Sequence, residues 1–351
     1  MNKLEKTVYR VLSALIPFRE LRKNFREKFI RKSHSSITQT HSIYGKIYTP
    51  IYNLSCELNN KEPEIYNKFG QNMETFFIRD MHSAHSPCGA SNYFIWDRYN
   101  FGLDTHFYTH KAMLETMGSP KRRYALLGES EGIVPEDYKI FDKHKGLNKD
   151  FDLIFTHSEQ ILEICDNARF HPACAAVWYG VIPSCGGILS NQAFSHKTKN
   201  ISMVSSNKSM CELHDFRINL ARKLKQKHIA DTYGTFDGGA AMRISESLTD
   251  YRYSVAVENI ISPYFFTEKI TNCFAAMTIP IYLGATKIDQ FFNADGIIQI
   301  IPKDFDNIEN ILKQCSRDDY EQRLPAILDN YNRVQKYLNL GDKLYEEYLK
   351  K

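Results

Sequence analysis

The 351-residue sequence predicts an α/β protein in which two parallel-sheet domains face a cleft. The length, at roughly 150 residues per domain, favours two domains over one. Short apolar runs alternate with polar turns and helical stretches, a pattern typical of βαβ units. This alternation forms two successive series, one over about residues 75–185 and one that starts near residue 199. Hydrophobic residues at 43% and charged residues at 25% are the proportions of an ordinary folded protein.

The composition also excludes several classes of protein. A net charge of +4 is too small for a dedicated nucleic-acid binder, so we expect no nucleic-acid partner. No run approaches the roughly 20 apolar residues of a membrane span, and no secretory signal is recognisable. The eight cysteines form no C-x-x-C pair, which is typical of reduced thiols. We therefore expect a cytoplasmic protein.

Residues 1–32 differ in composition from the rest of the chain. They contain ten Lys and Arg residues against three Glu residues, and their apolar residues recur at helical spacing on both sides of Pro17. Two short amphipathic helices with basic faces would bind an anionic surface, such as the inner face of the cytoplasmic membrane. A helical hairpin packed on the main body would show the same pattern. The sequence leaves both interpretations open.

The elements follow from the hydrophobic pattern of each domain. In the first domain, residues 33–195, a helix is expected at residues 158–165, and strands are expected at residues 93–96, 124–127, 152–156 and 175–181. In the second domain, residues 196–330, strands are expected at residues 201–205, 228–233, 253–257, 279–283 and 297–301. Helices are expected there at residues 211–226, 268–277, 307–315 and 318–330. A last amphipathic helix, residues 331–351, is expected to cross back over the first domain.

The densest chemical information lies where one apolar strand gives way to a helix. The strand ends at Glu258 and Asn259, and Thr267 is a good N-cap for the helix that follows. Ligands of open α/β sheets bind beyond the carboxyl ends of strands, where helix N-termini favour anions. Glu268 would accept hydrogen bonds from a ribose, and Lys269, unfavourable in a first turn without a compensating anion, would contact a phosphate. An ordinary first-turn acid beside a solvated lysine is the alternative.

Arg217 supports a nucleoside diphosphate site. It shares the inward stripe of the helix expected at residues 211–226 with three leucines. A charge on that stripe is costly unless it is paired. The preceding turn, residues 205–207, follows a strand end, which is again a ligand-facing position. Either a bound anion or a structural ion pair with a carboxylate would compensate Arg217.

Five blocks in this order and spacing resemble glycosyltransferase family 10, the α-1,3-fucosyltransferase family, in its bacterial form. They lie within about residues 199–302 and comprise residues 201–207 with Arg217, 231–234, 251–259, 264–269 and 279–284. The resemblance implies a GT-B fold of two Rossmann-like domains, the first on the acceptor side and the second binding the donor. It implies that Arg217 and Lys269 hold the diphosphate of GDP-fucose, Glu268 the ribose, and Asn259 and Tyr264 the rest of the donor.

The sequence departs from the family beside the expected sugar pocket. The family usually has Phe before the Glu-Asn pair and Ser after it, where this chain has Val257 and Ile260. The loop to Tyr264 also contains Pro263. These differences bear on the identity of the donor sugar and leave the nucleotide site intact.

The first domain resembles the family over about residues 123–141. A strand there delivers Glu129 toward the cleft, and the resemblance implies that Glu129 is the catalytic base. Because Glu131 and Glu136 follow closely, an acidic solvated loop is the alternative. Trp96 and His106 lie in aromatic-rich segments that would bind acceptor sugars by stacking, and core strands would explain these aromatics equally well.

The expected activity follows from the resemblance and not from composition. It is inverting, metal-independent transfer of fucose from GDP-fucose to a hydroxyl of a GlcNAc- or Glc-containing glycan, in lipopolysaccharide, surface polysaccharide or protein glycosylation. Two short D-x-D matches, at residues 150–152 and 304–306, do not indicate a metal site, so we expect neither a metal nor a cofactor. A GT-B transferase with another nucleotide sugar and a non-catalytic carbohydrate-binding protein are the alternatives.

Overall fold

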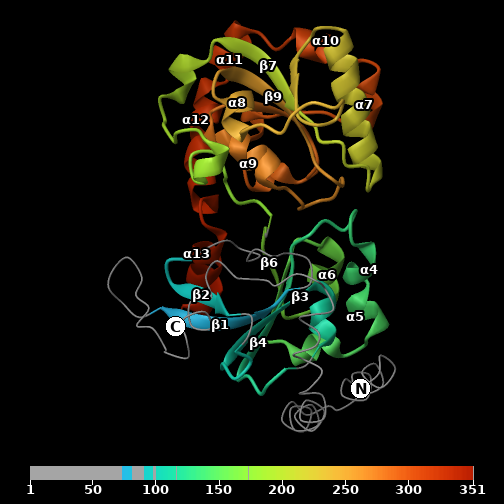
Figure 1. The fold of residues 1–351 in the computed structure, drawn as a ribbon, viewed down its shortest axis with the longest axis vertical. Helices are drawn as coiled ribbons and strands as arrows, with labels where there is room; N and C mark the ends of the chain where they lie inside the picture. Colours follow the sequence, from blue (N-terminus) through green and yellow to red (C-terminus); the bar gives the residue numbers. More distant parts are fainter. Residues whose placement is uncertain (1–72, 81–90, 98–99, 116, 173, 351) are drawn as a thin grey trace. The chain divides into compact units, whose positions relative to one another are not determined.

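The computed structural model describes residues 73–80, 91–97, 100–115, 117–172 and 174–350, which form two compact units (Figure 1). Unit 1 comprises the described residues up to residue 172 together with residues 341–350, and unit 2 is Cys174–Leu340. Among the described residues, no helix has the length and apolar character needed to cross a membrane. The basic segment at residues 1–32 lies outside them.

Unit 1 is built on a six-stranded parallel sheet of order β2-β1-β3-β4-β5-β6. Its strands are β1 (Glu74–Arg79), β2 (Phe94–Asp97), β3 (Thr105–Thr109), β4 (Arg122–Leu127), β5 (Leu153–Thr156) and β6 (Ala168–Phe170). Its helices are α4 (Pro135–Tyr138), α5 (Ile140–Lys143) and α6 (Glu159–Ile164), with short 3-10 helices at His110–Leu114 and Leu147–Asp150. Strands β2 and β3 are buried along their whole length, as expected for a parallel sheet covered on both faces.

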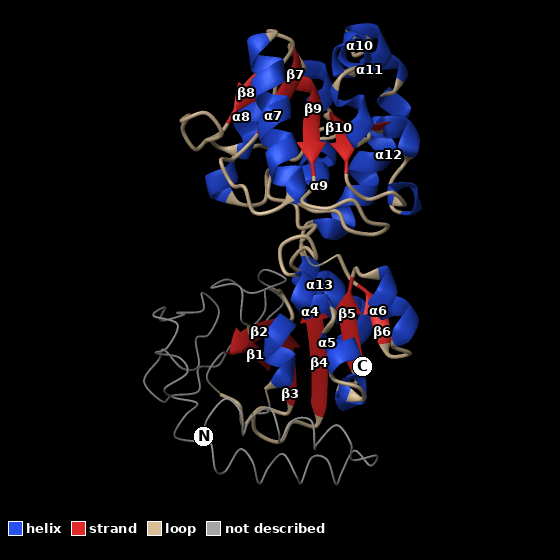
Figure 2. Ribbon diagram, turned by 90° about the vertical axis from the view of Figure 1, so that its right-hand side faces the viewer, coloured by secondary structure: helices blue, strands red, loops and turns tan. Residues whose placement is uncertain are grey.

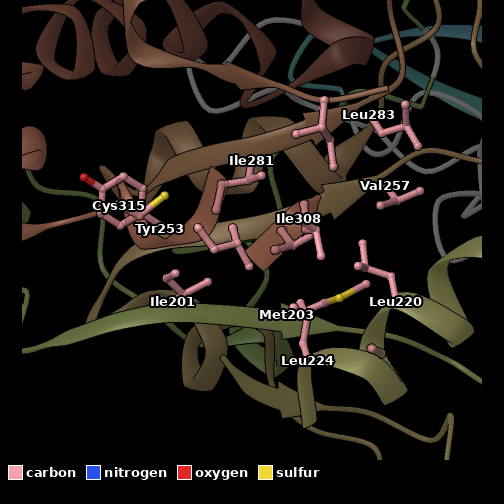
Figure 3. Close-up of a cluster of buried hydrophobic side chains, with 14 of the residues drawn as sticks. Ile201, Met203, Leu220, Leu224, Tyr253, Val257, Ile281, Leu283, Ile308 and Cys315 are labelled. Carbon is pink, nitrogen blue, oxygen red and sulfur yellow. The ribbon is translucent and has the colours of Figure 1, made fainter. Parts of the chain in front are cut away.

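Unit 2 is built on a five-stranded parallel sheet of order β11-β10-β9-β7-β8. Its strands are β7 (Lys199–Val204), β8 (Asp231–Tyr233), β9 (Tyr251–Val257), β10 (Ile279–Leu283) and β11 (Ile298–Gln299), and Figure 2 shows β9 and β10 side by side. Its helices are α7 (Glu212–Gln226), α8 (Ile244–Leu248), α9 (Glu268–Ala275), α10 (Ile308–Lys313), α11 (Arg317–Gln322) and α12 (Leu324–Val334). Side chains of β7, β9 and α7, including Met203, Val257 and Leu220, meet in one apolar core (Figure 3).

The order of strands in unit 2 reverses between β7 and β9. Strand β8 lies on one side of β7, whereas β9, β10 and β11 follow one another on the other side. The carboxyl ends of β7 and β9 therefore flank a topological switch point, the position where open parallel sheets bind ligands. Strand β7 ends directly before residues 205–207, and β9 ends directly before Glu258 and Asn259.

The predicted α/β class with two Rossmann-like parallel sheets is confirmed, whereas some boundaries differ. The units divide between residues 173 and 174 instead of 195 and 196, because the segment that follows packs within unit 2. In that segment the N–H groups of Trp178 and Tyr179 both donate to Asn272 Oδ1 on α9, at 2.8 and 2.9 Å. Residues 175–181 consequently do not form the predicted strand.

The C-terminal part of the chain also differs from the prediction. The helix expected at residues 318–330 is two helices, α11 and α12, because Pro325 occupies the first turn of α12 and cannot donate to α11. After α12 come a 3-10 turn, α13 (Leu340–Leu344) and a π-helical turn at Tyr345–Leu349, in place of one helix over residues 331–351. From Gly341 onward the chain belongs to unit 1, where Asp342 Oδ1 accepts hydrogen bonds from Ser91 Oγ (2.8 Å) and Asn92 N (2.6 Å).

Candidate active site

Arg217 joins the two strand ends at the switch point of unit 2. Its side chain comes from the inward face of α7 and is 7% exposed. Its Nη1 donates to the carbonyl of Val257, the last residue of β9, at 3.3 Å, and its Nη2 donates to Ser206 Oγ beyond β7 at 3.5 Å. The predicted inward position of this arginine is confirmed.

No carboxylate oxygen of the described residues lies within ion-pair distance of Arg217, and its Nε has no hydrogen-bond partner there. Burial lowers the pKa of this guanidinium below its ordinary value, and the more distant charges of Glu258 and Glu268 offset only part of that effect. The alternative of a structural ion pair is therefore not supported. A buried guanidinium with an unused donor favours an anionic ligand.

Lys269, unlike Arg217, lies within ion-pair distance of carboxylates. Its Nζ lies 3.3 Å from Glu258 Oε2, 3.5 Å from Glu268 Oε1 and 3.0 Å from Thr267 Oγ1. Burial alone would lower the pKa of Lys269, but the charges of Glu268 and Glu258 outweigh it and raise the pKa above the ordinary value. Lys269 is therefore a fixed positive charge beside the switch point, held between two carboxylates.

The first turn of α9 offers fewer backbone donors than the sequence suggests. Thr267 is the predicted N-cap, and its Oγ1 accepts from Lys269 N at 3.3 Å. The N–H of Glu268 donates to the Cys174 carbonyl at 3.0 Å, and that of Ile270 to the Thr267 carbonyl at 3.2 Å. These amides already have protein acceptors, so contact with a diphosphate would fall on side chains.

Asn259 is oriented by a histidine on α7. His214 Nδ1 accepts from Met210 N–H at 3.1 Å, so its Nε2 carries the proton and donates to Asn259 Oδ1 at 3.0 Å. Cys211 Sγ also donates to the Asn259 carbonyl, at 3.2 Å. Burial and the charge of Arg217 lower the pKa of His214, which favours this neutral form. Because Oδ1 accepts from His214, the group that Asn259 could offer to a ligand is its amide nitrogen.

Tyr264 lies on the loop between β9 and α9 and is partly exposed. Lys287 Nζ donates to its hydroxyl at 3.2 Å and lies 4.9 Å from the centre of its ring. These contacts place a further cation beside the loop. The role of Tyr264 in donor binding stays a prediction.

In unit 1, Glu129 follows β4 directly after Gly128. It is partly exposed, and its Oε1 accepts from Ser130 N–H at 2.7 Å. The backbone around it is fixed, because the N–H groups of Gly128 and Glu129 both donate to His110 Nε2, at 3.1 and 3.0 Å. The role of Glu129 as general base stays a prediction.

The two neighbouring acids have other surroundings. Glu136 is exposed and pairs with Lys139 at 3.2 Å and with Lys143. Glu131 is partly exposed, and burial raises the pKa of its carboxyl above the ordinary value. Of the three acids, Glu129 is the one whose backbone is anchored by a buried side chain of another element.

The structure contradicts the acceptor-binding prediction for Trp96 and His106. Trp96 is 1% exposed and packs edge-on against Phe94 and Phe107. His106 is fully buried, and its Nδ1 lies 2.9 Å from Tyr108 Oη. Both are core residues of the sheet, so neither side chain offers a face to a sugar.

One acid of each D-x-D match has a local structural role. Asp152 Oδ2 accepts from Arg123 N–H at 2.7 Å, and Asp304 Oδ2 accepts from Ile301 N–H at 2.8 Å. Metal independence stays a prediction.

Sequence reasoning missed Glu258 as a site residue. Its carboxylate is fully buried and accepts from Thr267 N (2.9 Å) and Thr267 Oγ1 (2.7 Å) in addition to Lys269. Gly284 leaves room for it, since a Cβ there would lie 2.4 Å from Glu258 Cγ. The sequence could have indicated this residue through its position between an apolar strand and Asn259, because an acid at the end of a buried strand needs a partner for its charge.

Comparison with known proteins identifies the domain that carries the switch-point site. Residues 194–325 match the model of the glycosyltransferase family 10 (fucosyltransferase) C-terminal domain. A putative fucosyltransferase of Acanthamoeba polyphaga mimivirus is 28% identical over 38% of this chain and 21% of its own length. A 3-galactosyl-N-acetylglucosaminide 4-α-L-fucosyltransferase of Bos taurus is 29% identical over 43% of this chain and 38% of its own. The chain thus spans less than two fifths of either relative.

A solved α1,3-fucosyltransferase structure is similar over 78% of this chain and 85% of its own, with 14% identity and a TM-score of 0.46. The matched residues 194–325 contain Arg217, Glu258, Asn259, Glu268 and Lys269. Residues 194–325, which lie within unit 2, therefore carry a glycosyltransferase family 10 (fucosyltransferase) C-terminal domain.

Proposed function

We propose that this protein is a fucosyltransferase that moves fucose from GDP-fucose to a hydroxyl of a GlcNAc- or Glc-containing glycan, with inversion and without a metal. The observation that carries the proposal is Arg217, a buried cation at the switch point of a family 10 domain, beside which the described part of the chain places no carboxylate. A diphosphate would supply the missing negative charge.

The chemistry assigned to unit 2 is stabilisation of the leaving group. Negative charge develops on the diphosphate as the bond to the sugar breaks, and cations already in place stabilise it. Arg217 and Lys269 supply such charges, while Glu268, 3.5 Å from Lys269 Nζ, would accept hydrogen bonds from the ribose. Asn259 and Tyr264 would contact the remainder of the donor.

The chemistry assigned to unit 1 is proton removal from the acceptor. A sugar hydroxyl is a poor nucleophile, so the proton must leave as the new bond forms on the face opposite the departing diphosphate. Glu129 is proposed as this base, because its carboxylate stands at a strand end on a fixed backbone. The glycan would belong to lipopolysaccharide, surface polysaccharide or protein glycosylation, assembled at the inner face of the cytoplasmic membrane.

Calorimetric titration of the full chain with GDP, UDP, CDP and GDP-fucose tests the donor assignment. We expect the two guanosine compounds to bind and the pyrimidine nucleotides to bind much more weakly, with EDTA present throughout. Preferred binding of UDP or CDP would indicate a transferase for another nucleotide sugar. GDP-fucose binding without hydrolysis or transfer on any glycan acceptor would indicate a carbohydrate-binding protein that has lost turnover.

A further inference from the structure

Four buried polar side chains surround the backbone of Glu129, and the proposed chemistry uses none of them. We call His110, Asp137, Tyr138 and His157 the Glu129 cradle. They come from three places in the chain: His110 follows β3, Asp137 and Tyr138 lie on α4, and His157 follows β5. Their exposures are 3%, 1%, 1% and 4%.

His110 holds the N–H side of this backbone. Its Nε2 accepts from Gly128 N at 3.1 Å and from Glu129 N at 3.0 Å. A ring nitrogen that accepts two hydrogens carries none of its own, so the proton of His110 is on Nδ1. That nitrogen lies 3.3 Å from Asp137 Oδ2, so a buried carboxylate faces the protonated side of the ring.

Tyr138 holds the carbonyl side. Its hydroxyl donates to the Glu129 carbonyl and lies 2.6 Å from His157 Nε2. Because the hydroxyl hydrogen is directed to Glu129, His157 Nε2 is the donor to the Tyr138 oxygen. The peptide on each side of Glu129 is thus anchored by a side chain that is itself held by a second one.

The carboxylate of Glu129 is held much less. Its Oε1 accepts from Ser130 N–H at 2.7 Å, and within the described part of the chain Oε2 has no hydrogen-bond partner. The cradle therefore fixes the backbone of Glu129 and leaves one carboxylate oxygen to accept from a ligand.

If the cradle only supported a buried turn, its polar side chains would be an unfavourable choice in free energy. Desolvated polar groups are expensive, and apolar side chains would fill the same volume. His110 also has φ 49°, in the left-handed region that a residue with a side chain rarely adopts. Strained backbone and buried polar networks of this kind cluster where a functional group must be placed accurately.

We infer that His110, oriented by Asp137, is a positioning residue that holds the Glu129 carboxylate in the geometry needed to take the acceptor proton. This inference rests on the proposed function, because it requires Glu129 to be the base. Displacement of a reacting group by about 1 Å costs on the order of 10²-fold in rate, which is the effect at stake.

The test is the variant His110→Phe, which keeps a planar ring and removes the acceptor of two N–H groups. With GDP-fucose and the best acceptor among lactose, lacto-N-biose and N-acetyllactosamine, we expect kcat to fall by on the order of 10²-fold. GDP affinity, measured by calorimetry, should be unchanged, because the donor residues lie in unit 2. Asp137→Asn, which removes the negative charge 3.3 Å from His110 Nδ1, should lower kcat in the same direction and serves if His110→Phe does not fold.

Two comparisons separate positioning from general stability. Asn167→Ala is the matched control, because Asn167 Nδ2 donates to two backbone carbonyls of another loop of unit 1, Asn148 (3.0 Å) and Phe151 (2.8 Å). It should lower the melting temperature while kcat of the folded protein is kept. In a Glu129→Gln background, His110→Phe should have no further effect on the residual rate.

Equal losses from His110→Phe with and without the Glu129 carboxylate would overturn the inference while leaving Glu129 as the base. A kcat that follows only the melting temperature, as in Asn167→Ala, would do the same. If Glu129→Gln keeps normal turnover, the base assignment of the proposed function fails first, and the inference fails with it.

Discussion

The positive charges of Arg217 and Lys269 belong to the same candidate site but have different surroundings. Arg217 is buried with no carboxylate of the described residues beside it, whereas Lys269 contacts both Glu258 and Glu268. The burial of Arg217 could be predicted from the sequence, because this residue falls on the apolar stripe of a helix. The surroundings of the two charges could not, since Glu258 meets Lys269 only through the packing of a strand end on the next helix.

The two cations should therefore respond in opposite ways to removal of their charge. Arg217→Met should leave the free energy of unfolding unchanged or raise it, because it removes a buried charge that no carboxylate of the described residues compensates. It should also weaken GDP binding by roughly 1.5–3 kcal/mol, the value of a charge-assisted hydrogen bond. Lys269→Met should instead destabilise the fold, toward the lower end of about 3–5 kcal/mol because Lys269 is partly exposed, since Glu258 would remain buried and unpaired.

Urea unfolding and GDP calorimetry on both variants check this contrast. A loss of stability in Arg217→Met comparable with that in Lys269→Met would show that Arg217 has a structural partner. Unchanged GDP affinity in Arg217→Met would remove it from the donor site.

Two buried histidines of unit 1 predict how stability depends on pH. Burial lowers the pKa of His157 to about 4, and burial together with the charge of Arg123 lowers that of His106 to about 3. Because both folded-state values lie below the ordinary value of about 6.5, the unfolded chain takes up protons that the folded form excludes. The free energy of unfolding should be fully retained above pH 6.5 and fall as the pH drops toward 4 and then 3, by up to about 1.4 kcal/mol per pH unit for each histidine.

Tryptophan fluorescence during urea unfolding of a Trp178→Phe variant measures this in unit 1, because Trp96 is then the only tryptophan of the sequence. His106→Phe serves as the control and should remove its share of the decline below pH 6.5. Equal stability at pH 7 and pH 4.5 would contradict the assignment of neutral buried imidazoles.

Among the elements, those with strict periodicity could be predicted and those defined by tertiary contacts could not. The helix at Glu268–Ala275 begins after its predicted N-cap, Thr267, because capping is a local property. The strands Glu74–Arg79 and Ala168–Phe170 were not predicted, since both mix charged with apolar residues. Residues 175–181 are apolar like a strand, yet their backbone is bound by Asn272 on α9.

Asn272→Ala should separate this segment from α9. Asn272 is 3% exposed, and its Oδ1 is the acceptor for two N–H groups, the buried one of Tyr179 and the partly buried one of Trp178. Each donor left without a partner costs about 1–3 kcal/mol, so the free energy of unfolding should fall by at least that amount. Asn310→Ala is the control, because Asn310 is exposed and its Nδ2 donates only to the Asn307 side chain, so its loss should change stability little. Equal stability of the two variants in urea would contradict the anchoring role of Asn272.

At the scale of the whole molecule, the two parallel sheets could be predicted from alternating apolar runs, whereas the division between units could not. The boundary lies at residue 173 because polar contacts tie residues 174–198 to unit 2, and such contacts leave no periodic pattern. For the candidate site, the sequence pattern was sufficient to predict the inward position of Arg217 on α7 and the positions of Lys269 and Glu129 after strand ends, while the roles of the three residues stay predictions. The pattern was not sufficient for Trp96, whose aromatic character fits a core as well as a sugar-binding surface.

Removal of residues 1–32 tests the two interpretations of the basic segment. If the segment binds membranes, the truncated protein should still bind GDP but no longer sediment with vesicles that contain phosphatidylserine. Each basic residue near such a surface contributes about 1 kcal/mol, and added salt should weaken the binding of the full chain. Vesicle binding that persists after the deletion, or a truncated protein that does not fold, would show that the segment packs on the body.

Fucose transfer itself tests the central claim most directly. The full chain and its Glu129→Gln variant are incubated in EDTA with GDP-fucose and lactose, lacto-N-biose or N-acetyllactosamine, and the products are identified by mass spectrometry and NMR. We predict a fucosylated product whose anomeric configuration is opposite to that of the donor, with a rate about 10²–10⁴-fold lower for the variant. Retention of the donor configuration, turnover that requires Mn²⁺, or no transfer from GDP-fucose to any of these acceptors would contradict the account.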